Sequence, residues 1–162
     1  MDDRFTYDSD FLVWTETQAR ALRELARTRA DLPNELDLEH VAEEIEDMGK
    51  SELNAVKSQI RNIMIHLIKV ACEPDGRAVP HWKSEIRAFH MALLDRLTPA
   101  MASRLDLATS WRRARSAVLD DCAEGGHTPA LTPPRDCPFD PADFTGERID
   151  VDTLFAKISS PG

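Results

Sequence analysis

The feature that most constrains this chain is an apolar periodicity that continues for about thirty residues. From Leu38 to Leu67, apolar side chains recur at the spacing of one face of an α-helix. The members of this stripe are Leu38, Val41, Ile45, Met48, Val56, Ile60, Ile63 and Leu67. Asp37 can cap its start, and Pro74 and Gly76 can end it. The sequence therefore predicts one long helix with a single inner face.

Gly49 interrupts this predicted helix. Glycine inside a helix costs about 1 kcal/mol relative to alanine. We therefore expect either a kink at this position or a place where another part of the backbone approaches closely.

Three further segments show helical spacing. The first, after a cap at Asp8 or Asp10, places these residues on one face: Phe11, Trp14, Gln18, Leu22 and Leu25. Another runs from about Pro80 to Leu97, and a fourth starts at the Thr98–Pro99 cap and stops at Gly125–Gly126. No segment alternates as a strand does. We predict an all-α fold in which residues 1–126 form a bundle of about four helices.

Residues 127–162 differ from the rest because they hold most of the ten prolines of the chain. We expect them to run mostly extended over the bundle as part of a single domain, with a short helix near Pro141–Phe144 capped by Asp140. The candidate apolar anchors of this tail are Phe139, Phe144, Leu154 and Phe155.

Composition limits the environment and the partners of the chain. Charged residues make up 30% and apolar residues 42%, and no apolar run approaches the roughly 20 residues that span a bilayer. The acidic first residues lack the apolar segment of a signal peptide. Three cysteines without a metal-binding spacing suggest reduced thiols. We expect a cytoplasmic protein that makes no contact with membranes.

The charge is unevenly distributed. The net charge of −9 makes nucleic-acid binding an unfavoured interpretation. Residues 31–52 carry nine acids and one lysine, whereas residues 77–115 carry eight Lys or Arg and three acids. Such blocks can neutralise each other between packed helices, which is the favoured interpretation, or across a homodimer.

The stretch Val41–Glu52 contains five carboxylates, and helical geometry divides them. Glu43 and Glu46 project away from the apolar stripe, and Glu46 can pair with Lys50. Glu44 and Glu52 do not fit this solvated face, because Glu44 lies at the edge of the apolar stripe and Glu52 lies inside it. Gln59 and His66 continue the line from Glu52 at intervals of seven residues, about 10.5 Å along a helix.

Other helices offer partners for these polar residues. Arg115 lies within the apolar stripe of the fourth predicted helix and needs an anion if it is buried. The candidate polar cluster comprises Gln18, Glu44, Glu52, His66 and Arg115. The favoured interpretation is a buried, hydrogen-bonded layer that sets helix register, and the alternative is a functional pocket.

Recognised catalytic and cofactor patterns are missing from the sequence. No Glu-x-x-His motif of a carboxylate-bridged metal site lies within a predicted helix. The sequence also lacks a glycine-rich phosphate loop and a nucleophile elbow. Cys72, at the end of the long helix, is better explained by packing than by catalysis. We therefore predict no metal and no cofactor.

Several short motifs resemble a known family. They are "YDSDFLVWTETQARALRE" (7–24), "AEEIEDMGKSE" (42–52), "HLIKV" (66–70), Trp82 and "CPF" (137–139). Together they resemble the bacterial family catalogued as domain of unknown function 29, over about residues 5–140. The resemblance implies an all-helical fold and supplies no activity. The segment after Phe144 departs from the usual ending of that family.

The leading functional hypothesis is a cytosolic, non-enzymatic helical protein that acts through protein–protein contact, with homodimerisation as one form of it. The segregated charge and the apolar anchors of the tail favour this reading. The alternative is an enzyme or a small-molecule or metal site built on the candidate polar cluster.

Overall fold

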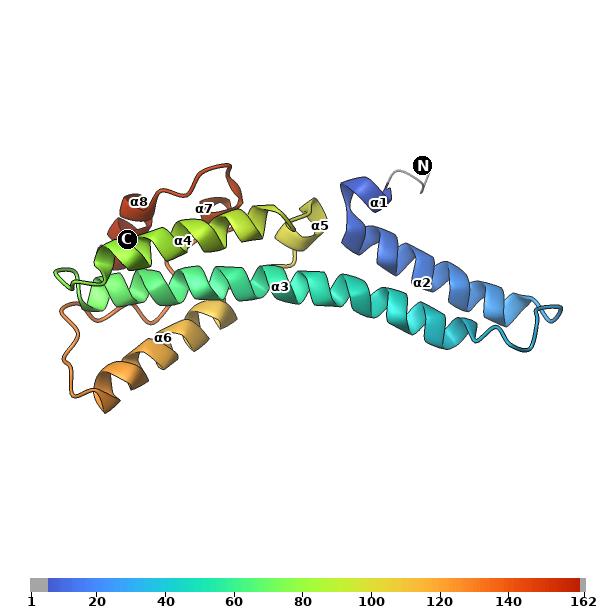
Figure 1. The fold of residues 1–162 in the computed structure, drawn as a ribbon, viewed down its shortest axis with the longest axis horizontal. Helices are drawn as coiled ribbons and strands as arrows, with labels where there is room; N and C mark the ends of the chain where they lie inside the picture. The colour runs from blue at the N-terminus through green and yellow to red at the C-terminus, as the bar shows by residue number, and fades with distance from the viewer. Residues whose placement is uncertain (1–5, 161–162) are drawn as a thin grey trace. The chain divides into compact units, whose positions relative to one another are not determined.

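A computed structural model describes residues 6–160, and all regular secondary structure in that range is helical (Figure 1). The helices are α1 (Thr6–Ser9), α2 (Phe11–Thr28), α3 (Leu38–Cys72), α4 (Val79–Leu94), α5 (Pro99–Ala102), α6 (Leu107–Glu124), α7 (Ala142–Thr145) and α8 (Val151–Ser159). The predicted all-α class is confirmed. Within the described range, no helix is both long enough and apolar enough to cross a membrane.

The chain divides into two compact units, and α3 contributes to both. The first, here the hairpin unit, comprises Met1–Ala55 and Thr98–Arg104. The second, here the core unit, comprises Val56–Leu97 and Leu105–Gly162.

In the hairpin unit, α2 and the first half of α3 run antiparallel and are capped as the sequence predicts (Figure 1). The Asp10 carboxylate accepts a hydrogen bond from the Val13 N–H at 3.2 Å. It also accepts one from the Ala100 N–H at 2.9 Å, which ties α5 to the start of α2. At the start of α3, the Asp37 carboxylate accepts from the His40 N–H at 3.2 Å.

Small residues bring α2 and α3 close together. Thr15, Ala19 and Ala42 are fully buried, and a Cβ atom added at Gly49 would lie 2.1 Å from Thr15 Oγ1 and 3.2 Å from Leu12 Cδ1. Gly49 is therefore a point of close approach, which was one of the two possibilities expected from the sequence. The approaching atoms belong to side chains of α2 and not to its backbone.

The core unit is built from large apolar side chains. In the second half of α3, Ile60, Ile63, Met64, Leu67 and Ile68 are at most 1% exposed. The helices around them contribute further buried residues, which are Ile86 and Leu93 of α4 and Trp111, Ala114 and Val118 of α6. This unit therefore holds most of the hydrophobic core.

The predicted fourth helix is wrong as a single element. Thr98 does cap a helix that starts at Pro99, but α5 ends at Ala102 and α6 begins at Leu107. The Asp106 carboxylate accepts a hydrogen bond from the Thr109 N–H at 2.9 Å and so caps the second piece. A second strong N-cap inside the segment thus starts a new helix. The predicted end is confirmed, since Gly126 follows α6 with φ of 67°.

The tail is more helical than predicted. α8 occupies residues predicted to be extended, and the Asp150 carboxylate caps it by accepting from the Asp152 and Thr153 N–H groups at 3.1 and 3.0 Å. α7 lies where the short helix was expected, but no side chain caps it, and the predicted Asp140 cap is wrong.

Backbone carbonyls of the tail accept hydrogen bonds from side chains elsewhere in the core unit. His90 Nε2 donates to Phe144 O at 3.1 Å, and Trp111 Nε1 donates to Pro134 O at 3.0 Å. Phe139 and Phe144, two of the predicted anchors, are buried and in edge-to-face contact. Each hydrogen bond gives a partner to a backbone carbonyl and to a side-chain N–H, which would be costly to bury without one.

Candidate functional site

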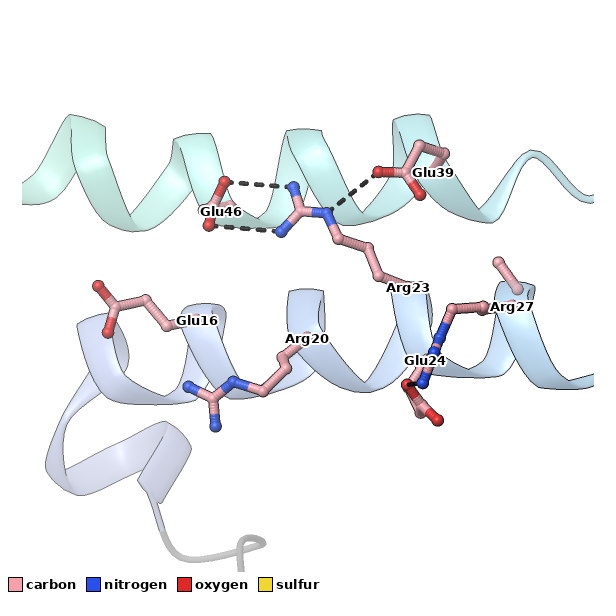
Figure 2. Close-up of a pocket in the computed structure, with 8 residues that line it drawn as sticks. Glu16, Arg20, Arg23, Glu24, Arg27, Glu39 and Glu46 are labelled. Atoms are coloured by element: carbon pink, nitrogen blue, oxygen red, sulfur yellow. Dashed lines mark hydrogen bonds and ion pairs between the residues drawn. The ribbon is translucent and has the colours of Figure 1, made fainter.

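A groove of about 740 Å³ lies between α2 and the start of α3 in the hairpin unit (Figure 2). The groove residues come from both helices and are Glu16, Arg20, Arg23, Glu24, Ala26, Arg27, Glu39 and Glu46. Their spacing follows helical geometry, because Arg20, Arg23 and Arg27 repeat at intervals of three and four residues. This repeat was not predicted, although the seven-residue spacing of Glu39 and Glu46 matches that of Arg20 and Arg27.

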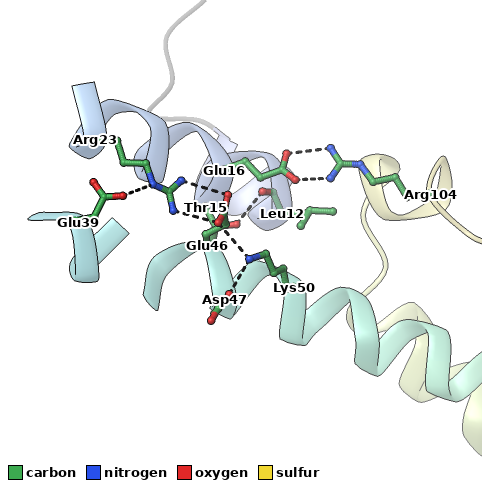
Figure 3. Close-up of polar contacts among 9 residues, drawn as sticks. All are labelled: Leu12, Thr15, Glu16, Arg23, Glu39, Glu46, Asp47, Lys50 and Arg104. Atoms are coloured by element: carbon green, nitrogen blue, oxygen red, sulfur yellow. Dashed lines mark hydrogen bonds and ion pairs between the residues drawn. The ribbon is translucent and has the colours of Figure 1, made fainter. Parts of the chain in front are cut away.

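Most charges of the groove are paired, either with one another or with Arg104. Arg23 Nε donates to Glu39 Oε1 at 3.2 Å, and Arg23 Nη2 donates to Glu46 Oε2 at 3.3 Å (Figure 2). Arg104 donates to both carboxylate oxygens of Glu16 (Figure 3). The hydrogen bond from Arg23 lowers the pKa of the Glu46 carboxyl, with a further contribution from Lys50. Ion pairs in the groove thus link α2 to α3 and engage most of its charged groups.

The predicted inner faces of α2 and of the first half of α3 are wrong in part, because Leu38 is buried as predicted but other members are exposed. Leu25 of α2 is 37% exposed, and Val41 and Met48 of α3 are 43% and 54% exposed. The residues buried in the contact instead include Leu12, Ala19 and Ala42. Small side chains let two helix backbones approach closely, so packing selects the small-residue face rather than the more apolar one.

The two exposed stripes lie on the side of the hairpin that faces away from the groove. Successive helical residues turn by about 100°, so the face in contact with the other helix separates two flanks. On each helix the groove residues form one flank and the stripe residues form the other. Because the groove residues of both helices line one groove, the two stripes share the opposite side.

Aromatic residues extend this surface at the start of α2. Tyr7 makes edge-to-face contacts with Trp14 and Phe11, at centroid distances of 4.8 and 5.7 Å. Tyr7 is itself 52% exposed, so the cluster is open to solvent. The apolar face is defined here by these residues and the stripes: Tyr7, Phe11, Trp14, Leu22, Leu25, Val41 and Met48.

The candidate polar cluster is divided between the two units. Gln18, Glu44 and Glu52 belong to the hairpin unit, and His66 and Arg115 belong to the core unit. Glu44 is exposed, and Gln18 and Glu52 are partly buried. Within the hairpin unit, these three residues lie on or beside the apolar face by helical phase.

The two members of the cluster in the core unit bond to backbone carbonyls. His66 Nδ1 donates to Asn62 O at 2.8 Å, and its ring lies 5.2 Å from that of Phe89. Arg115 Nε donates to Pro133 O at 3.0 Å, so the tail carbonyl supplies a partner that sequence reasoning did not anticipate. Both interactions fix neighbouring backbone segments.

A smaller cavity of about 120 Å³ lies in the core unit. Its lining includes Cys72, Cys122, Trp82 and His127. Burial, followed by the neighbouring Cys122 thiol, raises the pKa of Cys72 to about 11. Thiolate is the reactive form of cysteine, so Cys72 is a poor nucleophile near neutral pH. Among residues 6–160, no group of three or more His, Cys, Asp or Glu side chains is placed to hold a metal ion.

Comparisons with known proteins place this chain in a family. The model described as "Domain of unknown function DUF29" matches residues 6–148. The chain belongs to the DUF29 family. It is also similar to a crystal structure of an α-helical protein of unknown function from Rhodospirillum rubrum, at 39% identity and a TM-score of 0.89. That match covers 96% of this chain and 98% of the other. Among curated proteins, none matches this DUF29 chain.

Proposed function

We propose that this DUF29 protein is a cytoplasmic, non-enzymatic protein that acts through protein–protein contact, and that the apolar face of the hairpin unit is its contact surface. The observation that carries the proposal is the exposure of this face. Val41 and Met48 are 43% and 54% exposed on one helix, beside an aromatic cluster that includes Tyr7 at 52%.

The composition of the face suits an interface. Tyr, Trp, Phe and Met are enriched at the centres of protein interfaces, and the aromatic members bury a large area with few rotatable bonds. Trp14 lies against Tyr7 and Phe11, so its ring is held in place before a partner arrives. Such preorganisation lowers the entropic cost of binding.

The alternative, an enzyme or small-molecule site on the candidate polar cluster, has less support. His66 and Arg115 are engaged with backbone carbonyls. The raised pKa of Cys72 also removes the buried thiol as a nucleophile. No observation within residues 6–160 favours a particular reaction.

A photocrosslinking amino acid at a single position of the full chain tests the proposal in cells. We expect the cross-linker at position 48 to give one discrete adduct, identifiable by mass spectrometry. The adduct should disappear when Val41→Ser is added. A matched control places the cross-linker at position 91, because Met91 is 68% exposed but lies on α4 in the core unit.

One outcome would identify a homodimer, and another would overturn the proposal. An adduct of twice the chain mass, with a dimer in light scattering of the purified protein, would identify a homodimer. Identical adduct patterns from positions 48 and 91, together with a monomer at all concentrations, would overturn the proposal.

A further inference from the structure

We infer that the partner of the apolar face is a cationic amphipathic helix of another protein. This inference rests on the proposed function and adds the chemistry of the partner. Three features support it: the distribution of charge between the two units, the pairing of cations in the hairpin unit, and the two apolar stripes on one side of the hairpin.

Nearly all of the net charge resides in the hairpin unit. Its sequence segments contain fifteen Asp or Glu and seven Lys or Arg, which gives −8 of the total of −9. The core unit contains fourteen acids and thirteen bases and is close to neutral. The exposed apolar face therefore lies on the strongly anionic part of the molecule, whose potential attracts cations.

Most cations of the hairpin unit that the structure describes are already paired within it. Arg23 and Arg104 pair with groove carboxylates, and Lys50 pairs with Glu46 and Asp47 at 3.2 and 2.9 Å (Figure 3). Arg27 pairs with Glu24, which also lines the groove (Figure 2). Arg29 pairs with Asp31 at 2.7 Å. These pairs leave little positive charge to offset the surplus of carboxylates.

A carboxylate without a partner borders the apolar face. Glu44 is exposed, and within residues 6–160 it makes no hydrogen bond or ion pair. It lies one helical turn from Val41 and Met48 on the same helix. A lysine or arginine beside the apolar residues of a partner would meet Glu44 at the rim of the contact.

The arrangement of the face suits a helix. α2 and α3 are antiparallel neighbours, and each presents one stripe of apolar residues on the same side of the hairpin. A third helix that packs along both stripes buries them together, with its own anchors at i, i+3 or i+4, and i+7. The partner thus needs an apolar face and flanking basic residues.

Charge also disfavours the other occupants. A second copy would bring a second unit of charge −8 to the contact, which opposes dimerisation through this face. Nucleic acids and anionic lipid surfaces would be repelled for the same reason. A cationic helix is the occupant for which both apolar burial and electrostatics are favourable.

The test uses synthetic peptides of about 20 residues, long enough to form helix when bound. One carries leucines at i, i+3, i+4 and i+7 with lysines on the opposite face. The second replaces every lysine with glutamate, and the third has the composition of the first in a scrambled order that removes the apolar face. Fluorescence anisotropy of each labelled peptide with the full chain gives the Kd at low and high salt.

We expect only the ordered cationic peptide to bind tightly. Its Kd should rise about tenfold or more between low and high salt, as expected for attraction screened by ions. Val41→Ser with Met48→Ser should weaken binding by about tenfold or more, since both anchors are lost. Met91→Ser should leave the Kd unchanged, and circular dichroism establishes that each variant is folded.

The remaining outcomes overturn the inference in distinguishable ways. Equal binding of the scrambled peptide would show attraction to charge alone. Tighter binding of the glutamate peptide that depends on Val41 and Met48 would remove the cationic partner but retain the contact surface. A dimer that Met48→Ser dissociates would also overturn the inference while leaving the proposed function in place. No binding by any peptide, with no specific adduct at position 48, would overturn both.

Discussion

The two halves of α3 are built on opposite packing strategies, although they form one continuous helix. In the hairpin unit, Met48 is 54% exposed, and the contact with α2 is made by residues as small as Ala42 and Gly49. In the core unit, Met64 is fully buried. The comparison teaches that apolar periodicity predicts a helix reliably but does not show which face a neighbour will cover.

The two units are also stabilised by different interactions. The hairpin unit relies on a thin contact of small residues and on exposed ion pairs such as that of Arg23 with Glu39. Exposed ion pairs typically contribute about 0–1 kcal/mol each. The core unit buries large side chains, each worth about 1.5–3 kcal/mol. We therefore expect the hairpin unit to be the less stable of the two.

The sharpest test of the comparison is a matched pair of methionine truncations on α3. Met64→Ala should lower the free energy of unfolding by about 2–5 kcal/mol, because it opens a cavity in a packed core. Met48→Ala should change it by no more than about 0.5 kcal/mol, because the side chain is exposed. Urea denaturation monitored by circular dichroism measures both. Similar losses for the two variants would contradict the contrast between the halves.

The next test concerns the hydrogen bond that joins the tail to α4 within the core unit. His90→Leu should cost about 1–3 kcal/mol, because it leaves the Phe144 carbonyl without its hydrogen bond. The amides of α7 and α8 should then exchange faster with deuterium. His81→Leu is the matched control, since His81 is exposed on the same helix. Unchanged exchange in His90→Leu would show that other contacts hold the tail.

A smaller effect is expected at the close approach in the hairpin unit. Gly49→Ala should be destabilising by about 1 kcal/mol, because overpacking costs more than the helix propensity that alanine adds. The loss should shrink in a Thr15→Ala background, since Thr15 Oγ1 is the atom nearest the new Cβ. A double-mutant cycle in urea measures this coupling. A stabilising Gly49→Ala would show that α2 and α3 separate easily.

The smallest effect concerns pH and the first turn of α3. His40 Nδ1 lies 2.5 Å from Asp37 Oδ2, and this interaction raises the pKa of His40 and lowers that of Asp37. Because the pKa of His40 is raised, the pairing stabilises the turn fully below about pH 6.5. This stabilisation is lost as the pH rises through the raised pKa of His40. Because the pKa of Asp37 is lowered, the pairing also stabilises the turn above about pH 3.8. This stabilisation is lost as the pH falls through the lowered pKa of Asp37. The pairing should therefore be strongest between these values.

NMR titration of the His40 ring measures this prediction directly. Asp37→Asn should return the pKa of His40 toward its ordinary value, because it removes the carboxylate. An unchanged titration would show that the two side chains do not pair in solution.

Some missed features carried a signal in the sequence. Val151, Leu154 and Ile158 repeat at helical spacing after Asp150, so α8 was predictable despite the prolines around it. The arginines that line the groove were likewise visible as a repeat. The partners of Arg115 and Trp111 carried no such signal. Both bond to backbone carbonyls of the tail, and any residue type supplies that acceptor.

The sequence by itself determined several of the positions at which helices begin and end. The caps at Asp10, Asp37 and Thr98 and the stop at Gly126 depend on residues within one turn, so local rules predict them. Only the tertiary structure decided which face of each helix is buried. That choice depends on how closely two backbones can approach, which the contact of Gly49 with Thr15 controls across 34 positions of sequence. The same contact leaves Val41 and Met48 exposed and thereby creates the apolar face.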